Sequence, residues 1–109
     1  MKLWIIDSDN LGQIRIAKAP EGVTVIAASV KPRLLPVIGG NRVGKVVPVG
    51  PQASDFRLVA DTAVMLSSNH VTRDSILRVY TCDKGLANGI RQLANQYQMK
   101  FQWHKRYTQ

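Results

Sequence analysis

The chain is 109 residues long, the size of one folded domain. Hydrophobic residues make up 45% of it and charged residues 20%, close to the averages for globular proteins, so the composition excludes a disordered or fibrous chain. There are 15 lysines and arginines against 7 aspartates and glutamates, which gives a net charge of +8. A charge of that sign favours a polyanionic partner, and we expect nucleic acid.

The sequence also limits the location and the metal chemistry of the protein. No apolar stretch approaches the roughly 20 residues that a membrane span needs, and Asp7 and Asp9 come too early for a signal peptide. We therefore expect a soluble, cytoplasmic protein with no membrane association. The single cysteine, Cys82, excludes an internal disulfide, and there is no second cysteine to form a zinc cluster with the two histidines.

Apolar and β-branched runs predict five strands in chain order. They are Lys2–Ile6, Gly22–Ala27, Arg42–Val49, Ser75–Thr81 and Met99–Trp103. The first is apolar on both faces, which is typical of a central strand in a parallel sheet. The last alternates between its two faces as an edge strand does.

Residues with helical spacing fall between these strands. Leu11, Ile14 and Ala17 allow one or two turns before Pro20, whereas a short helix within 29–38 is disfavoured by two prolines. Longer helices are predicted after the third and fourth strands.

These longer helices cover Phe56–Asn69 and Leu86–Tyr97, and either Asp55 or Asp61 stands near the start of the first. Strands that alternate with helices predict a compact three-layer α/β/α domain with a mainly parallel central sheet of about five strands. We expect the whole chain, 1–109, to form this single domain, with a basic C-terminal end from about residue 100.

Two acidic residues, Asp7 and Asp83, directly follow predicted strands. In an open parallel sheet the binding site lies beyond the carboxyl ends of the strands, so these carboxylates meet if their strands are neighbours. Clusters of carboxylate oxygens suit Mg²⁺ or Mn²⁺, which can activate water against a phosphodiester. The alternative is structural, because an aspartate in such a position often caps the next helix.

Three stretches of the chain share their order and spacing with the motifs of one protein family. They are Ile5–Leu11 (Ile-Ile-Asp-Ser-Asp-Asn-Leu), Val59–Leu66 and Leu77–Asp83. The chain thereby resembles the PIN-like nucleases of the NYN type. The resemblance implies a PIN-like fold and a divalent-metal-dependent endoribonuclease that hydrolyses phosphodiester bonds in RNA. It further implies that Asp7, Asp61 and Asp83 are catalytic residues that bind Mg²⁺ or Mn²⁺. Asn10 matches the polar residue that completes the first motif.

The chain departs from the family at two points. Gly85 stands where the family often has a further acid, and Thr81 and Cys82 replace the Ser-Gly that precedes the third acid. A missing carboxylate weakens metal binding in a protein that is already positive. The alternative is therefore a catalytically inactive PIN-like domain that binds RNA or another nucleic acid, or that regulates through a protein partner.

Basic residues lie in the predicted loops and at the C-terminal end. The candidates for nucleic-acid contacts are Lys31, Arg33, Arg42, Lys45, Lys84, Lys105 and Arg106. Phe101 and Trp103 either stack on bases or belong to the core side of the last strand, because they alternate as strand residues do. The sequence leaves open whether the protein forms a homodimer or binds a protein partner.

Overall fold

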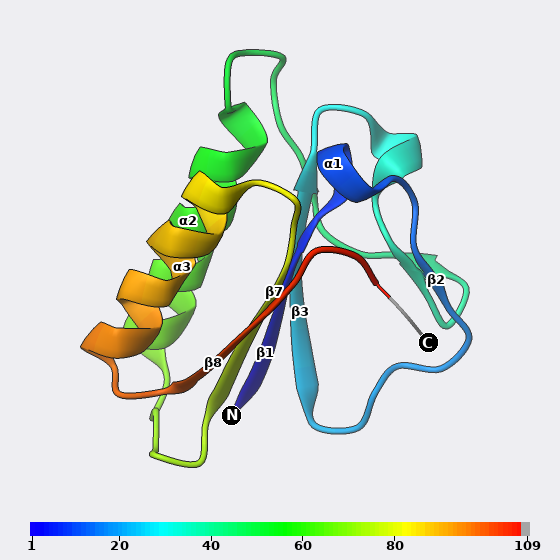
Figure 1. The fold of residues 1–109 in the computed structure, drawn as a ribbon. Coiled ribbons are helices and arrows are strands. Elements are labelled where there is room, and N and C mark those ends of the chain that lie inside the picture. Colours follow the sequence, from blue (N-terminus) through cyan, green and yellow to red (C-terminus); the bar gives the residue numbers. More distant parts are fainter. Residues whose placement is uncertain (108–109) are drawn as a thin grey trace.

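The computed structural model describes residues 1–107 and confirms the α/β architecture with a parallel central sheet. The five strands lie in the order β6-β3-β1-β7-β8 (Figure 1). Their bounds are β1 Lys2–Asp7, β3 Val23–Ser29, β6 Lys45–Val46, β7 Ile76–Tyr80 and β8 Lys100–His104. Residues 108–109 of the predicted domain lie outside the described residues. Within 1–107, no helix has the length and apolar character needed to cross a membrane.

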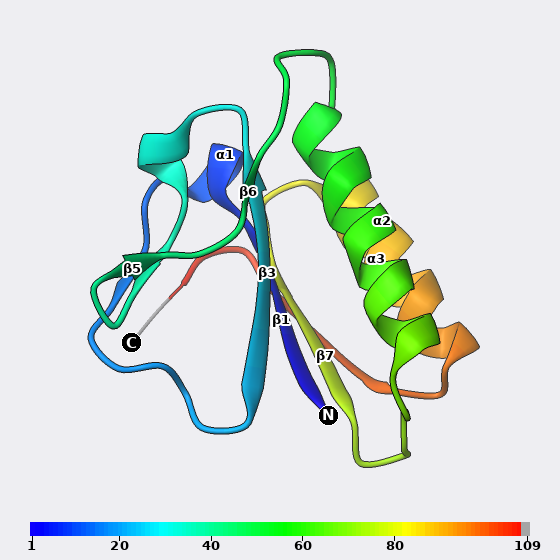
Figure 2. The same ribbon diagram turned by 180° about the vertical axis from the view of Figure 1, so that it is seen from behind.

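The first strand lies in the middle of the sheet. β1 pairs in parallel with β3 on one side and with β7 on the other. The strands that follow β1 in the chain, β3 and β6, lie on one side of it, and the later strands, β7 and β8, lie on the other side. Figure 2 shows β6 beside the carboxyl end of β3, where it pairs with Ala28 and Ser29. Ligands of open α/β sheets bind at such a switch point, beyond the carboxyl ends of the strands.

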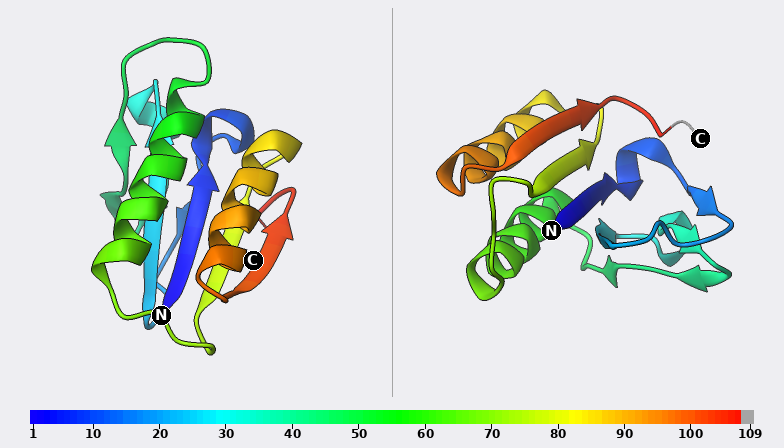
Figure 3. Two further views of the ribbon diagram at one scale, coloured as in Figure 1. Left: turned by 90° about the vertical axis from the view of Figure 1, so that its left-hand side faces the viewer. Right: turned by 90° about the horizontal axis from the view of Figure 1, so that it is seen from below.

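The two faces of the sheet are covered differently (Figure 3). The long helices α2 (Ala53–Ser68) and α3 (Lys84–Gln96) lie on one face. The other face carries α1 (Ser8–Leu11), a 3₁₀ turn at Pro32–Leu34, and a small sheet of β2 (Arg15–Ile16), β4 (Val37–Ile38) and β5 (Asn41–Arg42). Right-handed crossovers explain this division, because reversing the direction in which strands are added moves the connections to the opposite face.

Each face has its own apolar core. Leu3 and Ile5 point from β1 toward the long helices, whereas Trp4 and Ile6 point toward the small sheet, as the alternation of strand side chains requires. The helix side is filled by fully buried leucines, isoleucines and valines: Leu3, Ile5, Leu58, Leu66, Leu77, Val79 and Ile90. The core on the helix side holds α2 and α3 against the sheet, and the other core holds the small sheet against the opposite face.

The predicted third strand, Arg42–Val49, is divided in the structure. Asn41–Arg42 pairs antiparallel with β4, and Lys45–Val46 pairs in parallel with β3. Gly44 separates the two, with φ +111° and so close to β3 that a Cβ atom would lie 2.6 Å from the carbonyl oxygen of Ala27. The helical turns predicted from Leu11, Ile14 and Ala17 are also wrong: α1 covers Ser8–Leu11 and stops before Gly12, where φ is +74°, and Arg15–Ile16 forms a strand.

Replacing Gly44 by alanine is expected to destabilise the fold more than replacing Gly40. Both glycines have positive φ, so each alanine costs roughly 1–2 kcal/mol in left-handed strain. Only at Gly44 does the added methyl group also meet backbone atoms, whereas nothing lies within 4 Å of it at Gly40. Urea denaturation of Gly44→Ala and Gly40→Ala measures the difference. Equal free energies of unfolding would contradict the close approach of Gly44 to β3.

Candidate functional site

Four aspartates gather around the carboxyl end of β1. Asp7 ends β1, Asp9 lies in α1, Asp55 lies in the first turn of α2, and Asp83 caps α3 in the short connection after β7. Asp7, Asp9 and Asp83 all lie near enough to Asp55 to raise its pKa by their negative charge. We call these four residues the acid cluster. It lies at the switch point of the sheet, where a ligand site is expected.

Asp7 is the buried member of the cluster, with 0% of its surface exposed. Its Oδ2 accepts hydrogen bonds from the Thr81 hydroxyl at 2.6 Å and from the Asn10 side-chain amide at 2.5 Å. Its Oδ1 is buried as well and has no hydrogen-bond partner among the described residues. A buried, unpaired carboxylate oxygen is unfavourable, so this atom is suited to receive a ligand.

Asp83 connects the cluster to α3. Its Oδ1 accepts a hydrogen bond from the Leu86 backbone N–H at 3.1 Å, so the predicted capping role is confirmed. Its own backbone N–H donates to Thr81 Oγ1 at 2.9 Å. The hydrogen bond from Leu86 lowers the pKa of Asp83, because it stabilises the charged form. Thr81 therefore links Asp83 to the carboxylate of Asp7.

Asp55 is the member of the cluster whose pKa is raised. Its pKa is raised to about 7, first by burial, then by the charge of Asp7, by a hydrogen bond to Asp83, and by the charges of Asp83 and Asp9. Carboxylates at this separation repel one another, and in the absence of a cation one of them is most easily neutralised by binding a proton. The cluster is thus short of positive charge although the protein as a whole carries +8.

Asp9 is held by hydrogen bonds from two other elements. Its Oδ1 accepts from the Ser29 hydroxyl at 2.5 Å and from the Val30 backbone N–H at 3.3 Å, and its Oδ2 accepts from the Ser54 hydroxyl. Ser29 ends β3 and Ser54 lies at the start of α2. Asp9 therefore fixes the start of α2 beside β1, and adds negative charge while its own oxygens are engaged.

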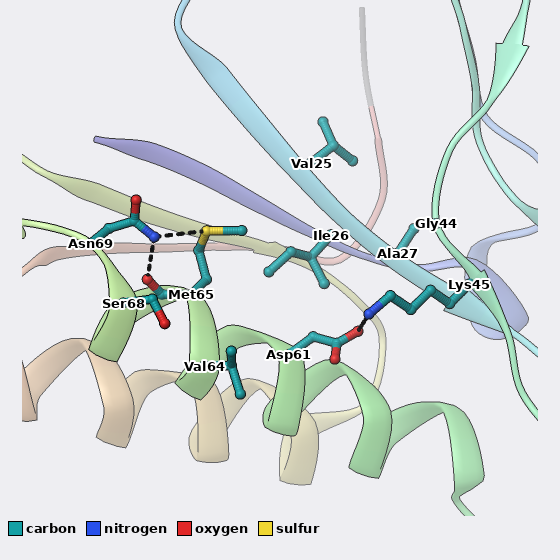
Figure 4. Close-up of a pocket in the computed structure, with 10 residues that line it drawn as sticks. All are labelled: Val25, Ile26, Ala27, Gly44, Lys45, Asp61, Val64, Met65, Ser68 and Asn69. Carbon is teal, nitrogen blue, oxygen red and sulfur yellow. Dashed lines mark hydrogen bonds and ion pairs between the residues drawn. The ribbon is translucent and has the colours of Figure 1, made fainter.

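The structure does not bring Asp61, the predicted second metal-binding acid, to the acid cluster. Asp61 lies six residues beyond Asp55 on α2, roughly 9 Å farther along the helix axis. Its carboxylate accepts from Arg57 Nε at 3.0 Å and pairs with Lys45 Nζ at 3.4 Å. It lines a cavity of about 410 Å³ between α2 and β3, where Figure 4 shows it pointing toward Lys45.

Asp55 occupies the place expected of Asp61. Both were candidates for the start of this helix, and the structure begins α2 at Ala53, which puts Asp55 in its first turn. The sequence signal that favours Asp55 is its position, because the first turn of the helix that follows β6 faces the carboxyl edge of the sheet. Thr81 was not predicted as a functional residue, although it is the residue that joins Asp7 to Asp83.

Several of the predicted basic residues lie at the same edge of the sheet. Lys31 and Arg33 follow β3, Lys84 begins α3, and Lys105 follows β8, and all of them are exposed. The others lie elsewhere: Arg42 is in the small sheet, Lys45 pairs with Asp61, and Arg106 lines a hollow beside Tyr107.

Phe101 and Trp103 belong to the core. Both pack against the buried cluster beneath the long helices, and Trp103 Nε1 donates to the Thr81 carbonyl oxygen at 2.9 Å. The core interpretation of these two aromatic residues is therefore confirmed.

Among residues 1–107, no group of three or more histidine, cysteine, aspartate or glutamate side chains is placed so that it could hold a metal ion. Hydrogen bonds hold one oxygen each of Asp7 and Asp83 and both oxygens of Asp9, and Asp55 is hydrogen-bonded to Asp83. The chain matches no protein-family model, no curated protein and no solved structure. The function is therefore inferred from the residues of the acid cluster and their charges.

The proton on Asp55 makes the stability of the metal-free protein depend on pH. Because its folded pKa of about 7 exceeds the ordinary value of 3.8, the folded state holds this proton more tightly than the unfolded chain. The stability from this group is complete below about pH 3.8 and is lost as pH rises through about 7. Melting temperatures in a chelating buffer from pH 5 to pH 8 measure the loss, which Asp55→Asn should reduce. The control Asp61→Asn should keep it, and a dependence unaffected by Asp55→Asn would contradict the assignment.

The cap on α3 gives a second test of the cluster. Asp83→Ala removes the acceptor for the Leu86 N–H and is expected to cost about 0.5–2 kcal/mol of folding stability. Asp83→Asn keeps an oxygen acceptor and also removes one negative charge from the cluster, so it should be more stable than Asp83→Ala. Urea denaturation in a chelating buffer compares the two. Equal losses in both variants would contradict the capping geometry.

Proposed function

We propose that this chain is a PIN-like domain that acts on RNA as a divalent-metal-dependent endoribonuclease. The observation that carries the proposal is the acid cluster at the switch point of the sheet, with a buried and unpartnered oxygen on Asp7 beside a proton-binding Asp55. A strongly basic protein that concentrates carboxylates at one edge suits a cation placed between those carboxylates and a polyanionic substrate.

The donor set fits Mg²⁺ or Mn²⁺. The cluster offers only oxygen atoms, which these ions prefer, and it contains no histidine or cysteine of the kind that binds zinc. Asp7, Asp55 and Asp83 would have to rearrange to hold the ion, because no three such side chains among the described residues are placed to hold one. The ion would then neutralise the charge that otherwise favours a proton on Asp55. The chemistry that such an ion supplies is a lower pKa for water and neutralisation of the attacked phosphate.

The other residues of the site position these carboxylates. Thr81 and Asn10 both donate to Oδ2 of Asp7, which leaves Oδ1 buried and without a hydrogen-bond partner among the described residues. The Leu86 N–H fixes Asp83 at the start of α3. The exposed amines of Lys31, Lys84 and Lys105 lie at the same edge, where they can bind phosphates on either side of the scissile bond.

A second candidate is an inactive PIN-like domain that binds RNA without cleaving it. Two observations favour it: Gly85 replaces a further acid, and no three ligands are already in place for one ion. The two candidates share the RNA substrate and differ in their need for metal.

Metal binding should raise the thermal stability of the protein. At a Mn²⁺ concentration roughly 100 times the Kd, a site present only in the folded state adds about 2.7 kcal/mol. Asp55→Asn should lose this gain, because it removes a charged ligand. Asp61→Asn should keep it, because it makes the same change on the same helix outside the cluster. Melting curves with and without Mn²⁺ measure the effect, and equal gains in wild type and Asp55→Asn would contradict the proposed ligands.

The same variants test cleavage. Wild type and Asp61→Asn should cut a labelled single-stranded RNA in Mg²⁺ or Mn²⁺ and not in a chelating buffer, whereas Asp7→Asn and Asp55→Asn should not cut it. Fragments are resolved on a denaturing gel. Binding without cleavage in either metal would support the inactive candidate, and cleavage retained by Asp55→Asn would overturn the proposed site.

A further inference from the structure

A ladder of aromatic and cationic side chains lies on the face of the sheet opposite α2 and α3. It consists of Trp4 from β1, Arg78 and Tyr80 from β7, His104 from β8, and Tyr107 from the segment that follows. Strand alternation explains the shared face, because their neighbours Leu77, Val79, Phe101 and Trp103 pack on the helix side. We call these five residues the aromatic ladder. None of them belongs to the acid cluster.

Direct contacts connect the members of the ladder. The Arg78 guanidinium lies 5.0 Å from the ring centre of Trp4 and donates to the Tyr80 hydroxyl at 3.0 Å. Tyr80 meets the edge of Trp4 at 5.6 Å, stacks on His104 at 5.4 Å with 26° between the rings, and meets Tyr107 at 5.4 Å. Arg78 is also held by Gln102, whose Oε1 accepts from Nε at 2.8 Å. The rings are therefore fixed before any ligand arrives.

The ladder is open to a ligand. His104 is exposed, and Trp4, Arg78 and Tyr107 are half-buried over a buried Tyr80. Two hollows flank it. One of about 240 Å³ has Trp4, Lys2 and Arg78 in its walls, and one of about 350 Å³ has Tyr107 and Arg106 in its walls. In Figure 1 the segment after β8 runs across this face toward the side where β2 lies.

The charges beside the ladder are mostly positive. Lys2 and Lys100 begin β1 and β8 and share the ladder's face by strand alternation, and Arg106 precedes Tyr107. Glu21 is the acidic residue that lines the first hollow. Cations beside rings with accessible faces match a ligand that carries phosphates and planar bases.

We propose that the aromatic ladder is a binding platform for single-stranded RNA. This inference rests on the proposed function, since it assigns the surface that holds the substrate. Bases stack on His104, on Tyr107 and against Trp4 with its guanidinium partner, and Lys2 and Lys100 bind phosphates. In the sheet register His104 lies opposite Tyr80, which lies opposite Ile6, the residue before Asp7. A strand on the platform therefore reaches the edge of the sheet beside the acid cluster.

The test uses a fluorescently labelled oligouridine in a chelating buffer, so that binding is measured without cleavage. His104→Ala removes an exposed stacking ring and is expected to weaken binding at least about fivefold. The double variant Lys2→Gln/Lys100→Gln removes two exposed charges and should weaken it about tenfold at low salt. The matched control Arg73→Gln/Arg91→Gln also removes two exposed charges, in positions off the ladder, and should change the Kd less than twofold.

A second readout identifies the ring that is contacted. In Trp103→Phe the remaining indole of the two in the sequence is Trp4, whose fluorescence should be quenched on binding. Equal weakening by ladder and control variants, or binding without quenching of Trp4, would overturn the platform. Absence of oligouridine binding at low salt would also overturn the RNA platform, and would favour an acidic protein as the partner of this basic surface.

The outcomes also separate the platform from the proposed nuclease. Asp61→Asn should bind oligouridine as wild type does, because Asp61 lies in the cavity between α2 and β3 and belongs neither to the acid cluster nor to the ladder. Binding that depends on the ladder, with no cleavage in Mg²⁺ or Mn²⁺, would support the platform and reject the nuclease. Cleavage that is unaffected by the ladder variants at subsaturating RNA would support the nuclease and reject the platform.

Discussion

The structure depends on the burial of one carboxylate, that of Asp7, at the end of the central strand. Two hydrogen bonds, from Thr81 and Asn10, satisfy one of its oxygens and leave the other buried without a partner among the described residues. Thr81 directly follows β7, and its hydroxyl also accepts a hydrogen bond from the backbone N–H of Asp83. The same carboxylate therefore fixes the ends of β1 and β7 and the start of α3. A buried charge is tolerated only where neighbouring groups compensate for it. The charges around Asp7 therefore indicate the charge of a ligand that would suit the site.

Those surroundings add negative charge where positive charge would stabilise Asp7. The negative charge around Asp55, together with its burial, raises its pKa to about 7, which favours the protonated form of this carboxyl. Asp9 is held in place by hydroxyl groups from β3 and α2. A divalent cation meets the same electrostatic need more fully than a proton does, which is the physical basis of the proposed metal site. The two faces of the sheet have different surfaces. Asp55 and Asp83 come from the helix side, whereas the opposite side carries the rings and cations that we propose bind a single strand of RNA.

The regular parts of the fold could be predicted from the sequence, because periodicity records which side of an element is buried. The mostly apolar run Lys2–Ile6 indicated the central strand, and the stripe from Leu86 to Tyr97 indicated α3. The division of residues 42–49 was not visible, since it depends on the contact of Gly44 with Ala27 in three dimensions. The same holds for the site. Asp7 and Asp83 were found because they follow strands. The choice between Asp55 and Asp61 depended on where α2 begins, and a difference of about 1.7 turns moves a carboxylate to another cavity.

The most direct measurement is an NMR titration of the aspartate carboxyl carbons in the folded protein, without divalent metal and then with Mg²⁺. The account predicts that Asp55 titrates near pH 7 without metal, because Asp7, Asp83 and Asp9 surround it, and that Mg²⁺ moves this midpoint to lower pH by competing with the proton. Asp61, in its ion pairs with Arg57 and Lys45, should not respond to Mg²⁺. An Asp55 midpoint near its ordinary value of 3.8, unchanged by Mg²⁺, would contradict both the charge-coupled cluster and the metal site.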